Sequence, residues 1–202
     1  MTSPATASPV LRIAVIIASV REGRFGPVVA DWFVSRARTH GGIEIDLIDL
    51  ATVALPMALP RRGGPVSAEA ATALEPLTPR MDAADGFVVV TPEYNHSYPA
   101  SLKNLVDWHF TQWQAKPVAF VSYGGISGGL RAVEHLRHVF AELHAVTVRD
   151  TVSFHGAWER FEEDGRPKDP EAVDAAAKTM LDQLAWWALS LRESREKRPY
   201  TA

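Results

Sequence analysis

The chain has 202 residues, of which 47% are hydrophobic and 22% charged, and its formal net charge is −3. This length and composition predict one compact α/β domain, and the small negative charge excludes a global basic field that would attract nucleic acid or an anionic membrane. The sequence contains no cysteine, which excludes disulfides, thiolate metal sites and cysteine nucleophiles.

The two ends of the chain are expected to lie outside the folded unit. The segment "MTSPATASPV" has neither the charged start nor the apolar core of a signal peptide, so residues 1–9 are predicted to form a disordered leader. One domain is expected over residues 10–195, followed by a tail over residues 196–202. No apolar run approaches the ~20 residues needed to cross a bilayer. The sequence therefore predicts a soluble, cytoplasmic protein.

Segments of strand-like and helix-like periodicity alternate along the chain. The first, "LRIAVIIAS", is almost continuously apolar, which is typical of a strand buried on both faces. Pro27 is well placed to begin a helix, and Thr78, followed by Pro79, is expected to cap another. The predicted strands span residues 11–19, 43–50, 86–91, 116–125 and 146–154, and helices are predicted to begin near residues 27, 68, 78, 97, 129 and 170, the last of them ending near residue 195.

The order of these segments predicts where a ligand binds. Five strands separated by helices indicate a parallel sheet, because right-handed crossovers return the chain in the same direction. In such sheets ligands lie beyond the carboxyl ends of the strands, near the point where the strand order reverses. The loops after the first, third and fourth strands are therefore the candidate binding loops.

The loop after the first strand, "ASVREGRFGPV", has the features of an anion site. Gly23 and Gly26 permit tight backbone geometry, and the helix that begins at Pro27 presents unpaired amides and a positive dipole end. Arg21 and Arg24 add formal charge. A single phosphate is the expected ligand, since neither the GxxxxGK[ST] nor the GxGxxG pattern occurs here. The alternative is a plain turn whose glycines serve folding alone.

The loop after the third strand opens the segment "TPEYNHSYPASLKNLVDW". Pro92 stiffens the loop, Asn95 and Ser97 offer uncharged polar groups, and Tyr94 and His96 supply planar surfaces. Such a loop is suited to the polar edge of a heteroaromatic ring. The alternative is a simple strand-to-helix connection in which Ser97 caps the helix.

The loop after the fourth strand, "SYGGISGGLR", contains four glycines, which let a flat group approach the backbone closely, and Tyr123 is able to stack on such a group. The same segment satisfies G-x-S-x-G around Ser127, and Asp150 and His155 follow in the order of a hydrolase triad. However, two residues separate the strand from the motif, and the chain is short for the hydrolase sheet. A serine hydrolase is therefore the weaker alternative.

One predicted helix carries three residues of the types that bind metal ions. His135, His138 and Glu142 share a helix face, but this spacing lacks a third convergent partner. A solvated amphipathic helix explains the pattern equally well, so no metal is predicted.

The segments "ASVREGRFGPVVADW", "DGFVVVTPEYNHSYPASLKNLVDW" and "SYGGISGGLRAVEHLR" together resemble the NADPH-dependent FMN reductase family of flavodoxin-like proteins. The likeness covers most of residues 10–190, and its P-E-Y-N-x-S-x-P-x-x-L-K-N segment is highly specific. The resemblance implies an α/β, flavodoxin-like, doubly wound five-stranded parallel sheet in the order 2-1-3-4-5, with helices on both faces. It also implies that FMN binds noncovalently at the carboxyl edge.

The resemblance assigns the three loops separate roles. The first loop holds the FMN phosphate, and the other two border the isoalloxazine ring. Members often carry Ser and Asn where this chain has Arg24 and Gly26, and they often begin the loop with Gly where Ala18 stands here. This departure predicts that charge replaces hydroxyl and amide hydrogen bonds to phosphate. The implied cofactor-binding residues are Ser19, Arg21, Gly23, Arg24, Phe25, Gly26, Pro92, Glu93, Tyr94, Asn95, Ser122, Tyr123, Gly124 and Gly125.

The activity implied by the resemblance is that of an NAD(P)H oxidoreductase. NADPH or NADH reduces bound FMN, and a quinone, azo, metal or flavin acceptor then reoxidises it. No catalytic side chain is expected, because the flavin carries the chemistry. Family members are typically homodimers or homotetramers. The alternative is a flavodoxin-like electron carrier without its own NAD(P)H oxidation, although a charge of −3 gives weak support to the strongly negative face such carriers use.

Overall fold

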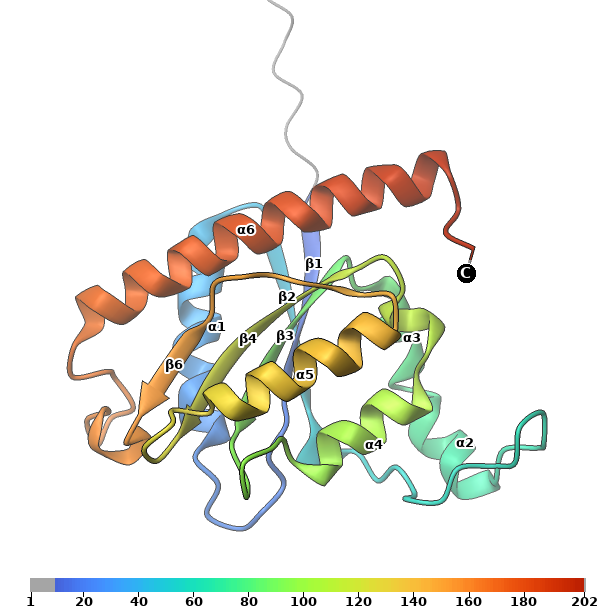
Figure 1. The fold of residues 1–202 in the computed structure, drawn as a ribbon, viewed down its shortest axis with the longest axis horizontal. Coiled ribbons are helices and arrows are strands. Elements are labelled where there is room, and N and C mark those ends of the chain that lie inside the picture. The colour runs from blue at the N-terminus through green and yellow to red at the C-terminus, as the bar shows by residue number, and fades with distance from the viewer. Residues whose placement is uncertain (1–9, 202) are drawn as a thin grey trace, which may run out of the picture.

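The computed structural model describes residues 10–201, so the expected leader at residues 1–9 lies outside the described residues. These residues form a central sheet covered by helices on both sides (Figure 1). Within residues 10–201, no helix combines the length and the apolarity needed to cross a membrane. The strands are β1 (Leu11–Ile17), β2 (Ile43–Asp49), β3 (Gly86–Pro92), β4 (Pro117–Gly124), β5 (Val146–Thr147) and β6 (Val152–His155), and the helices are α1 (Gly26–His40), α2 (Ala68–Leu74), α3 (Thr78–Ala83), α4 (Ala100–Trp108), α5 (Leu130–Glu142) and α6 (Pro170–Lys197).

The sheet is parallel and has the order β2-β1-β3-β4-β5, with β6 also paired to β4. The predicted fold class and strand order are therefore confirmed. The order reverses between β1 and β3, so the carboxyl ends of these two strands form the point where ligands bind in such folds.

The predicted fifth strand is the main correction to the fold. It consists of two short strands, β5 and β6, which pair with different parts of β4. Between them the chain leaves the ladder, and the Arg137 guanidinium donates to the carbonyls of Val148, at 2.8 Å, and Arg149, at 3.0 Å. These bonds replace the sheet partners that the two carbonyls would otherwise need. The alternating apolar pattern predicts the strand but does not reveal its interruption.

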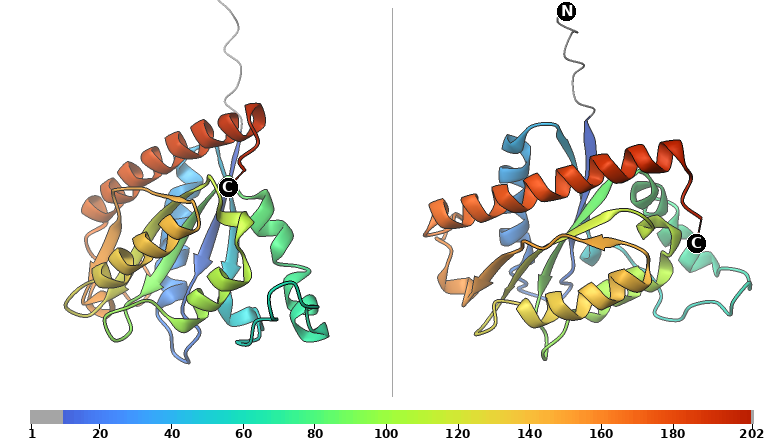
Figure 2. Two further views of the ribbon diagram at one scale, coloured as in Figure 1. Left: turned by 45° about the vertical axis from the view of Figure 1, so that its right-hand side comes forward. Right: turned by 45° about the horizontal axis from the view of Figure 1, so that its top comes forward.

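The two faces of the sheet have separate cores. Ile13, Val15 and Ile17 of β1 pack with α1 and α6, whereas Ala14 and Ile16 pack with α3, α4 and α5. Figure 2 shows α6 lying across one side of the sheet, with α4 and α5 on the other. Because side chains alternate across a strand, a strand covered on both faces must be apolar throughout. This explains the continuous apolar run of β1.

The predicted helix cap at Thr78 is wrong, and the alternative cap at Ser97 is not formed either. Thr78 lies inside the first turn of α3, and Leu77 occupies the N-cap position. The Thr78 hydroxyl instead lies 3.0 Å from Nε2 of the buried His109. The N-cap of α4 is Pro99, not the alternative Ser97. In both cases a tertiary contact or a proline, rather than the local hydroxyl, sets the helix boundary.

Candidate functional site

The three candidate loops meet at one edge of the molecule. The connections after β1, β3 and β4 all emerge at the lower edge of Figure 1, from three adjacent strands of the sheet. The expected proximity of the loops is therefore present in the fold, and each loop is described in turn below.

The loop after β1 presents a run of free amides. Within residues 10–201, the amide nitrogens of Val20 to Gly26 donate no hydrogen bond to the chain. Gly23 has φ +63°, which turns the backbone into a conformation that L side chains rarely adopt. The loop ends at the amino terminus of the 15-residue helix α1. Unpaired amides at a helix start are a suitable cradle for an anion.

A buried hydrogen bond between two side chains supports the loop after β1. The Tyr123 hydroxyl donates to Ser19 Oγ at 3.1 Å, and both residues are buried. Burial, the largest influence, raises the pKa of Tyr123, so the phenol stays neutral and remains a donor. A Cβ at Gly26 would lie 2.4 Å from Ser19 Oγ and 2.9 Å from the Tyr123 oxygen. Strand β4 therefore reaches the loop after β1 through the Tyr123 side chain, for which only a glycine at position 26 leaves room.

The two arginines of the first loop have different surroundings. Arg24 forms two hydrogen bonds of 2.6 Å with Asp49 at the end of β2, and a third of 2.9 Å with the Ser19 carbonyl. Its side-chain hydrogen bond holds the pKa of Asp49 below the usual range. Arg21 is exposed, and its guanidinium carbon lies 5.7 Å from the centroid of the Tyr94 ring. Arg24 therefore stabilises the loop after β1 through contacts within the protein, whereas Arg21 extends toward the loop after β3.

The loop after β3 makes a tight turn. The amide of Tyr94 donates to the Ser97 carbonyl at 2.8 Å, and the amide of Ser97 donates back at 3.0 Å. The two residues between them, Asn95 and His96, have φ +49° and +69°. Asn and His both occur in this left-handed region more often than most other side chains do. Within residues 10–201, the amides of Asn95 and His96 have no chain partner, so they are available to a ligand.

Two glycines determine the backbone conformation of the loop after β4. Gly128 and Gly129 have φ +60° and +85°, and their positions lie so close to Ser153 and Ser122 that a Cβ would clash. The Gly128 carbonyl accepts from Ser122 Oγ at 2.8 Å. The amides of Gly125 to Ser127 donate no hydrogen bond within residues 10–201. The loops after β3 and β4 follow neighbouring strands, and both expose unpaired amides. Such amides suit the polar edge of a planar ligand.

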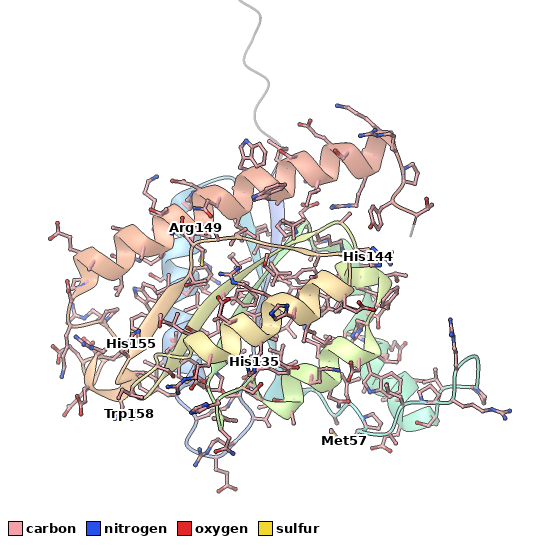
Figure 3. All side chains as sticks on the ribbon, viewed as in Figure 1. Met57, His135, His144, Arg149, His155 and Trp158 are labelled. Carbon is pink, nitrogen blue, oxygen red and sulfur yellow. The ribbon has the colours of Figure 1, made fainter. Side chains whose placement is uncertain are left out.

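The sequence did not predict several residues that support the site. The Ser101 hydroxyl of α4 donates to the Ala18 carbonyl at 2.5 Å, Asp49 holds Arg24, and Arg131 holds Glu93. The exposed Trp158 ring lies near Gly125, 3.9 Å from where its Cβ would stand. Figure 3 shows Trp158 and His155 at the same lower corner of the molecule. These contacts join distant segments and leave no local pattern in the sequence.

The hydrolase and metal alternatives gain no support. Nδ1 of His155 lies 3.0 Å from the Ile126 carbonyl, whereas the Asp150 carboxylate contacts Arg149 and Gln183, so the expected acid–histidine contact is not formed. Nδ1 of His135 lies 3.0 Å from the Ser97 hydroxyl. Within residues 10–201, no three His, Asp or Glu side chains are grouped to hold a metal ion.

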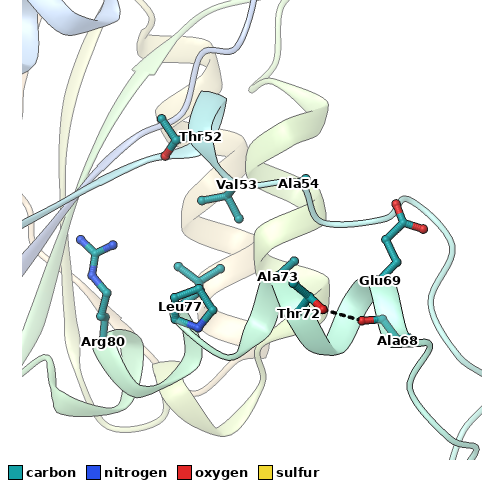
Figure 4. A pocket seen from close by; sticks show the side chains of 10 residues that line it. Thr52, Val53, Ala54, Ala68, Glu69, Thr72, Ala73, Leu77 and Arg80 are labelled. Carbon is teal, nitrogen blue, oxygen red and sulfur yellow. Dashed lines mark hydrogen bonds between the residues drawn. The ribbon is translucent and has the colours of Figure 1, made fainter.

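Two cavities lie beside these loops rather than within them. One, of about 660 Å³, lies between the segment after β2 and helices α2 and α3, and it shares no residue with the three loops (Figure 4). Another, of about 400 Å³, includes Val20 of the first loop and is otherwise lined by residues after β2 and at the start of α4. Its wall is largely apolar, and its polar members Ser101 and Asn104 already donate to backbone carbonyls. The first cavity therefore touches none of the three loops, and the second touches them only at Val20.

Comparison with known proteins decides the family. Residues 11–159, which span all three loops, match the family described as NADPH-dependent FMN reductase. The chain belongs to this family. The predicted resemblance is thereby confirmed, and with it the assignment to a family of flavin-linked oxidoreductases.

Several relatives of this FMN reductase family member have names of the same kind. An NAD(P)H-dependent FMN reductase of Schizosaccharomyces pombe is 37% identical over 132 residues, which is 63% of this chain and 64% of that protein. A probable NADPH:quinone oxidoreductase of rice (Oryza sativa) is 32% identical over 93% of both chains. A quinone reductase of Escherichia coli is 30% identical over 86% of this chain and 89% of that protein.

A solved structure supports the fold assignment for this family member. FerB of Paracoccus denitrificans, a flavoenzyme NAD(P)H:(acceptor) oxidoreductase, superposes with a TM-score of 0.70 at 22% identity, covering 88% of this chain and 98% of that one. At this identity the likeness concerns the fold alone.

The residues present fit the cofactor that the family name implies. FMN combines a dianionic phosphate with a planar ring that has polar edges. The free amides from Val20 to Gly26 suit the phosphate, and those of Asn95 and His96 and of Gly125 to Ser127 suit a ring edge. In the loop after β4, Gly125 leaves its backbone accessible to a flat group, since the nearest atom to a Cβ there would be in Trp158, at 3.9 Å.

Proposed function

We propose that this chain is an NAD(P)H-dependent FMN reductase that transfers electrons to small-molecule acceptors, with quinones as the leading class. The family assignment and the quinone reductase names of relatives aligned over most of the chain support this function. The observation that carries it is the convergence of three loops whose backbone amides have no partner within residues 10–201.

The chain's own residues bind and orient the reactants. The amides from Val20 to Gly26 and the exposed Arg21 are proposed to hold the phosphate, with Ser19, Arg24 and Phe25 supporting the loop. The segments 92–95 and 122–125 are proposed to border the ring. When bound, FMN supplies the hydride and electron transfer chemistry. The free amides of Asn95 and His96 and of Gly125 to Ser127 would stabilise negative charge at the ring's polar edge without a general acid.

The proposed electron acceptors are small molecules. The names of relatives aligned over most of the chain favour quinones. Azo compounds, free flavin and metal oxyanions are the further proposed acceptor classes. Either NADPH or NADH is the proposed donor. We also propose that residues 10–195 act as a single FMN-binding domain and that the chain assembles into a homodimer or homotetramer, as its family resemblance implies.

A steady-state assay tests this function. The purified protein with FMN should oxidise NADPH or NADH rapidly when a quinone is present. A yellow protein that leaves both nicotinamides unoxidised would instead indicate an electron carrier. Replacing Ser127 by alanine should leave this oxidation largely intact, because the variant keeps the Ser127 backbone amide and the Arg131 contacts of Glu93, whereas a serine hydrolase would lose its nucleophile. Parallel reactions with azo, chromate and free flavin acceptors would rank the acceptor classes.

A further inference from the structure

A buried carboxylate connects the two loops that are proposed to border the ring. Glu93 follows β3, and its side chain is only 7% exposed. One carboxylate oxygen accepts from the amide of Arg131 at 3.1 Å, and the other accepts from the Arg131 guanidinium at 2.9 Å. Arg131 is the second residue of α5, the helix that begins directly after the glycine-rich loop. Glu93 therefore binds a helix that belongs to a different loop.

The backbone of Glu93 also binds that loop. Its amide donates to the Tyr123 carbonyl at 3.2 Å, one residue before the first glycine. A Cβ at Gly124 would lie 3.7 Å from the Glu93 Cβ, so the two chains are in van der Waals range. Main-chain and side-chain contacts thus fix Glu93 to both ends of the segment from Tyr123 to Arg131.

The capping of α5 explains why a carboxylate is present. The N-cap residue is Gly129, which has no side chain to accept from the first-turn amides. Its φ of +85° and the contacts at its Cβ position favour glycine there. Glu93 supplies the missing acceptor from the neighbouring loop. Burial alone would raise the pKa of the Glu93 carboxyl, but hydrogen bonds from Ser127 and Arg131 outweigh burial and lower it. The positive end of the α5 helix dipole also favours the ionised carboxylate.

Glu93 connects the two segments that carry free amides. Asn95 and His96 follow it by two and three residues, and the unpaired amides from Gly125 to Ser127 lie inside the segment that it spans. A local cap on Gly129 would have stabilised α5 without connecting the loops. The cross-loop contact instead sets the distance between the two amide groups.

We propose that Glu93 is a positioning residue that holds the two ring-bordering loops at the separation an isoalloxazine ring requires. This inference rests on the proposed function, because it assigns the ring to these loops. Glu93 acts through the loops and not by touching the reacting atoms. Its loss should therefore weaken the hold on the ring and leave the phosphate contacts in place.

The test compares ligands that share the ring but differ in phosphate. FMN, riboflavin and lumiflavin, which consists of the ring alone, are titrated into wild type and into E93A, E93Q and R131A. In E93A all three ligands should bind about tenfold more weakly, because one charge-assisted contact is lost. E93Q, which keeps an acceptor oxygen, should recover much of the loss. The visible circular dichroism of bound FMN should change in E93A and return toward wild type in E93Q.

A matched control separates positioning from general stability. Glu134→Gln removes the same charge from an exposed pair with Arg137 on the same helix, and it should bind all three ligands like wild type. Unchanged ring affinity in E93A, E93Q and R131A, with only the unfolding midpoint in urea lowered, would overturn the positioning role. If E93A does not fold, E93Q and R131A decide the same question. Failure of wild type to bind any of the three ligands would instead refute the proposed function.

Discussion

Single residues determine whether the first loop is able to hold a phosphate. Arg24 was expected to replace hydrogen bonds to the phosphate, but its guanidinium is paired with Asp49 and the Ser19 carbonyl. That direct phosphate contact stays a prediction. The structure gives Arg24 a bracing contact that keeps the loop in place. Arg21 is exposed at the mouth of the site, and it is the side chain better placed to meet a phosphate.

The role of Arg21 leads to a binding prediction. Arg21→Ala should weaken FMN binding about tenfold, because it removes one charge-assisted phosphate contact. It should change riboflavin binding little, since riboflavin has no phosphate. Fluorescence titration with both ligands provides the measurement. Arg62→Ala, on an exposed segment away from the three loops, is the control for loss of charge. Equal losses for FMN and riboflavin in Arg21→Ala would contradict the assigned contact.

Gly26 leads to a stability prediction. Gly26→Ala should cost about 2 kcal/mol of unfolding free energy, because the new methyl would overlap Ser19, Ile17 and Tyr123 at distances between 2.4 and 2.9 Å. Gly125→Ala is the control, since its nearest neighbour would be Trp158 at 3.9 Å. Urea unfolding of the protein without flavin provides the measurement. Equal stability of the two variants would show that the loop relaxes around position 26.

At the scale of elements, sequence patterns predict what depends on local order. The continuous apolar run of β1 and the alternation of strands and helices were enough to predict the parallel sheet and the edge that carries the loops. The split between β5 and β6 was not predictable, because it depends on Arg137, which comes from another element. The pairing of Arg24 with Asp49 and of Glu93 with Arg131 likewise joins residues 25 and 38 positions apart. Such pairs form only because the fold brings distant residues together.

The docking of α6 on the sheet leads to an element-scale prediction. Asp85, at the start of β3, accepts from the amide of Arg12 and from the Arg192 guanidinium, both at 3.0 Å. Asp85→Ala should lower the unfolding free energy by about 2 kcal/mol, because it removes the nearest carboxylate of a partly buried guanidinium and the acceptor of the Arg12 amide. Glu193→Ala, which removes an exposed contact on the same helix, should cost less than about 0.5 kcal/mol. Similar losses in thermal or urea unfolding would argue against a docking role for Asp85.

At the scale of the whole molecule, one buried cation makes stability depend on pH. Lys116 precedes β4, and its ammonium donates to the Met81 and Asp82 carbonyls at 3.0 and 2.9 Å, near the end of α3. Burial, with a smaller contribution from Arg195, lowers the pKa of Lys116 from 10.5 to about 8. Between these two values the unfolded chain binds more protons than the folded one. The contribution of Lys116 to the free energy of unfolding therefore rises with pH between about 8 and 10.5. Below that range the cost of burying the charged ammonium is fully present.

The corresponding measurement is the difference in unfolding free energy between wild type and Lys116→Met as a function of pH. Taking this difference removes the contribution of other groups that titrate in the same range. Wild type should gain about 3 kcal/mol relative to the variant between pH 8 and pH 10.5. A flat difference profile would show that Lys116 retains an ordinary pKa in the folded protein.

The most direct test of the central claim is an equilibrium titration of the flavin-free protein with FMN, followed by the quenching of flavin fluorescence. The three-loop site predicts saturable binding of one FMN per chain, with FMN bound more tightly than riboflavin because the first loop contacts its phosphate. Failure to bind FMN, or equal affinity for FMN and riboflavin, would contradict the assignment of the first loop to the phosphate of a bound flavin.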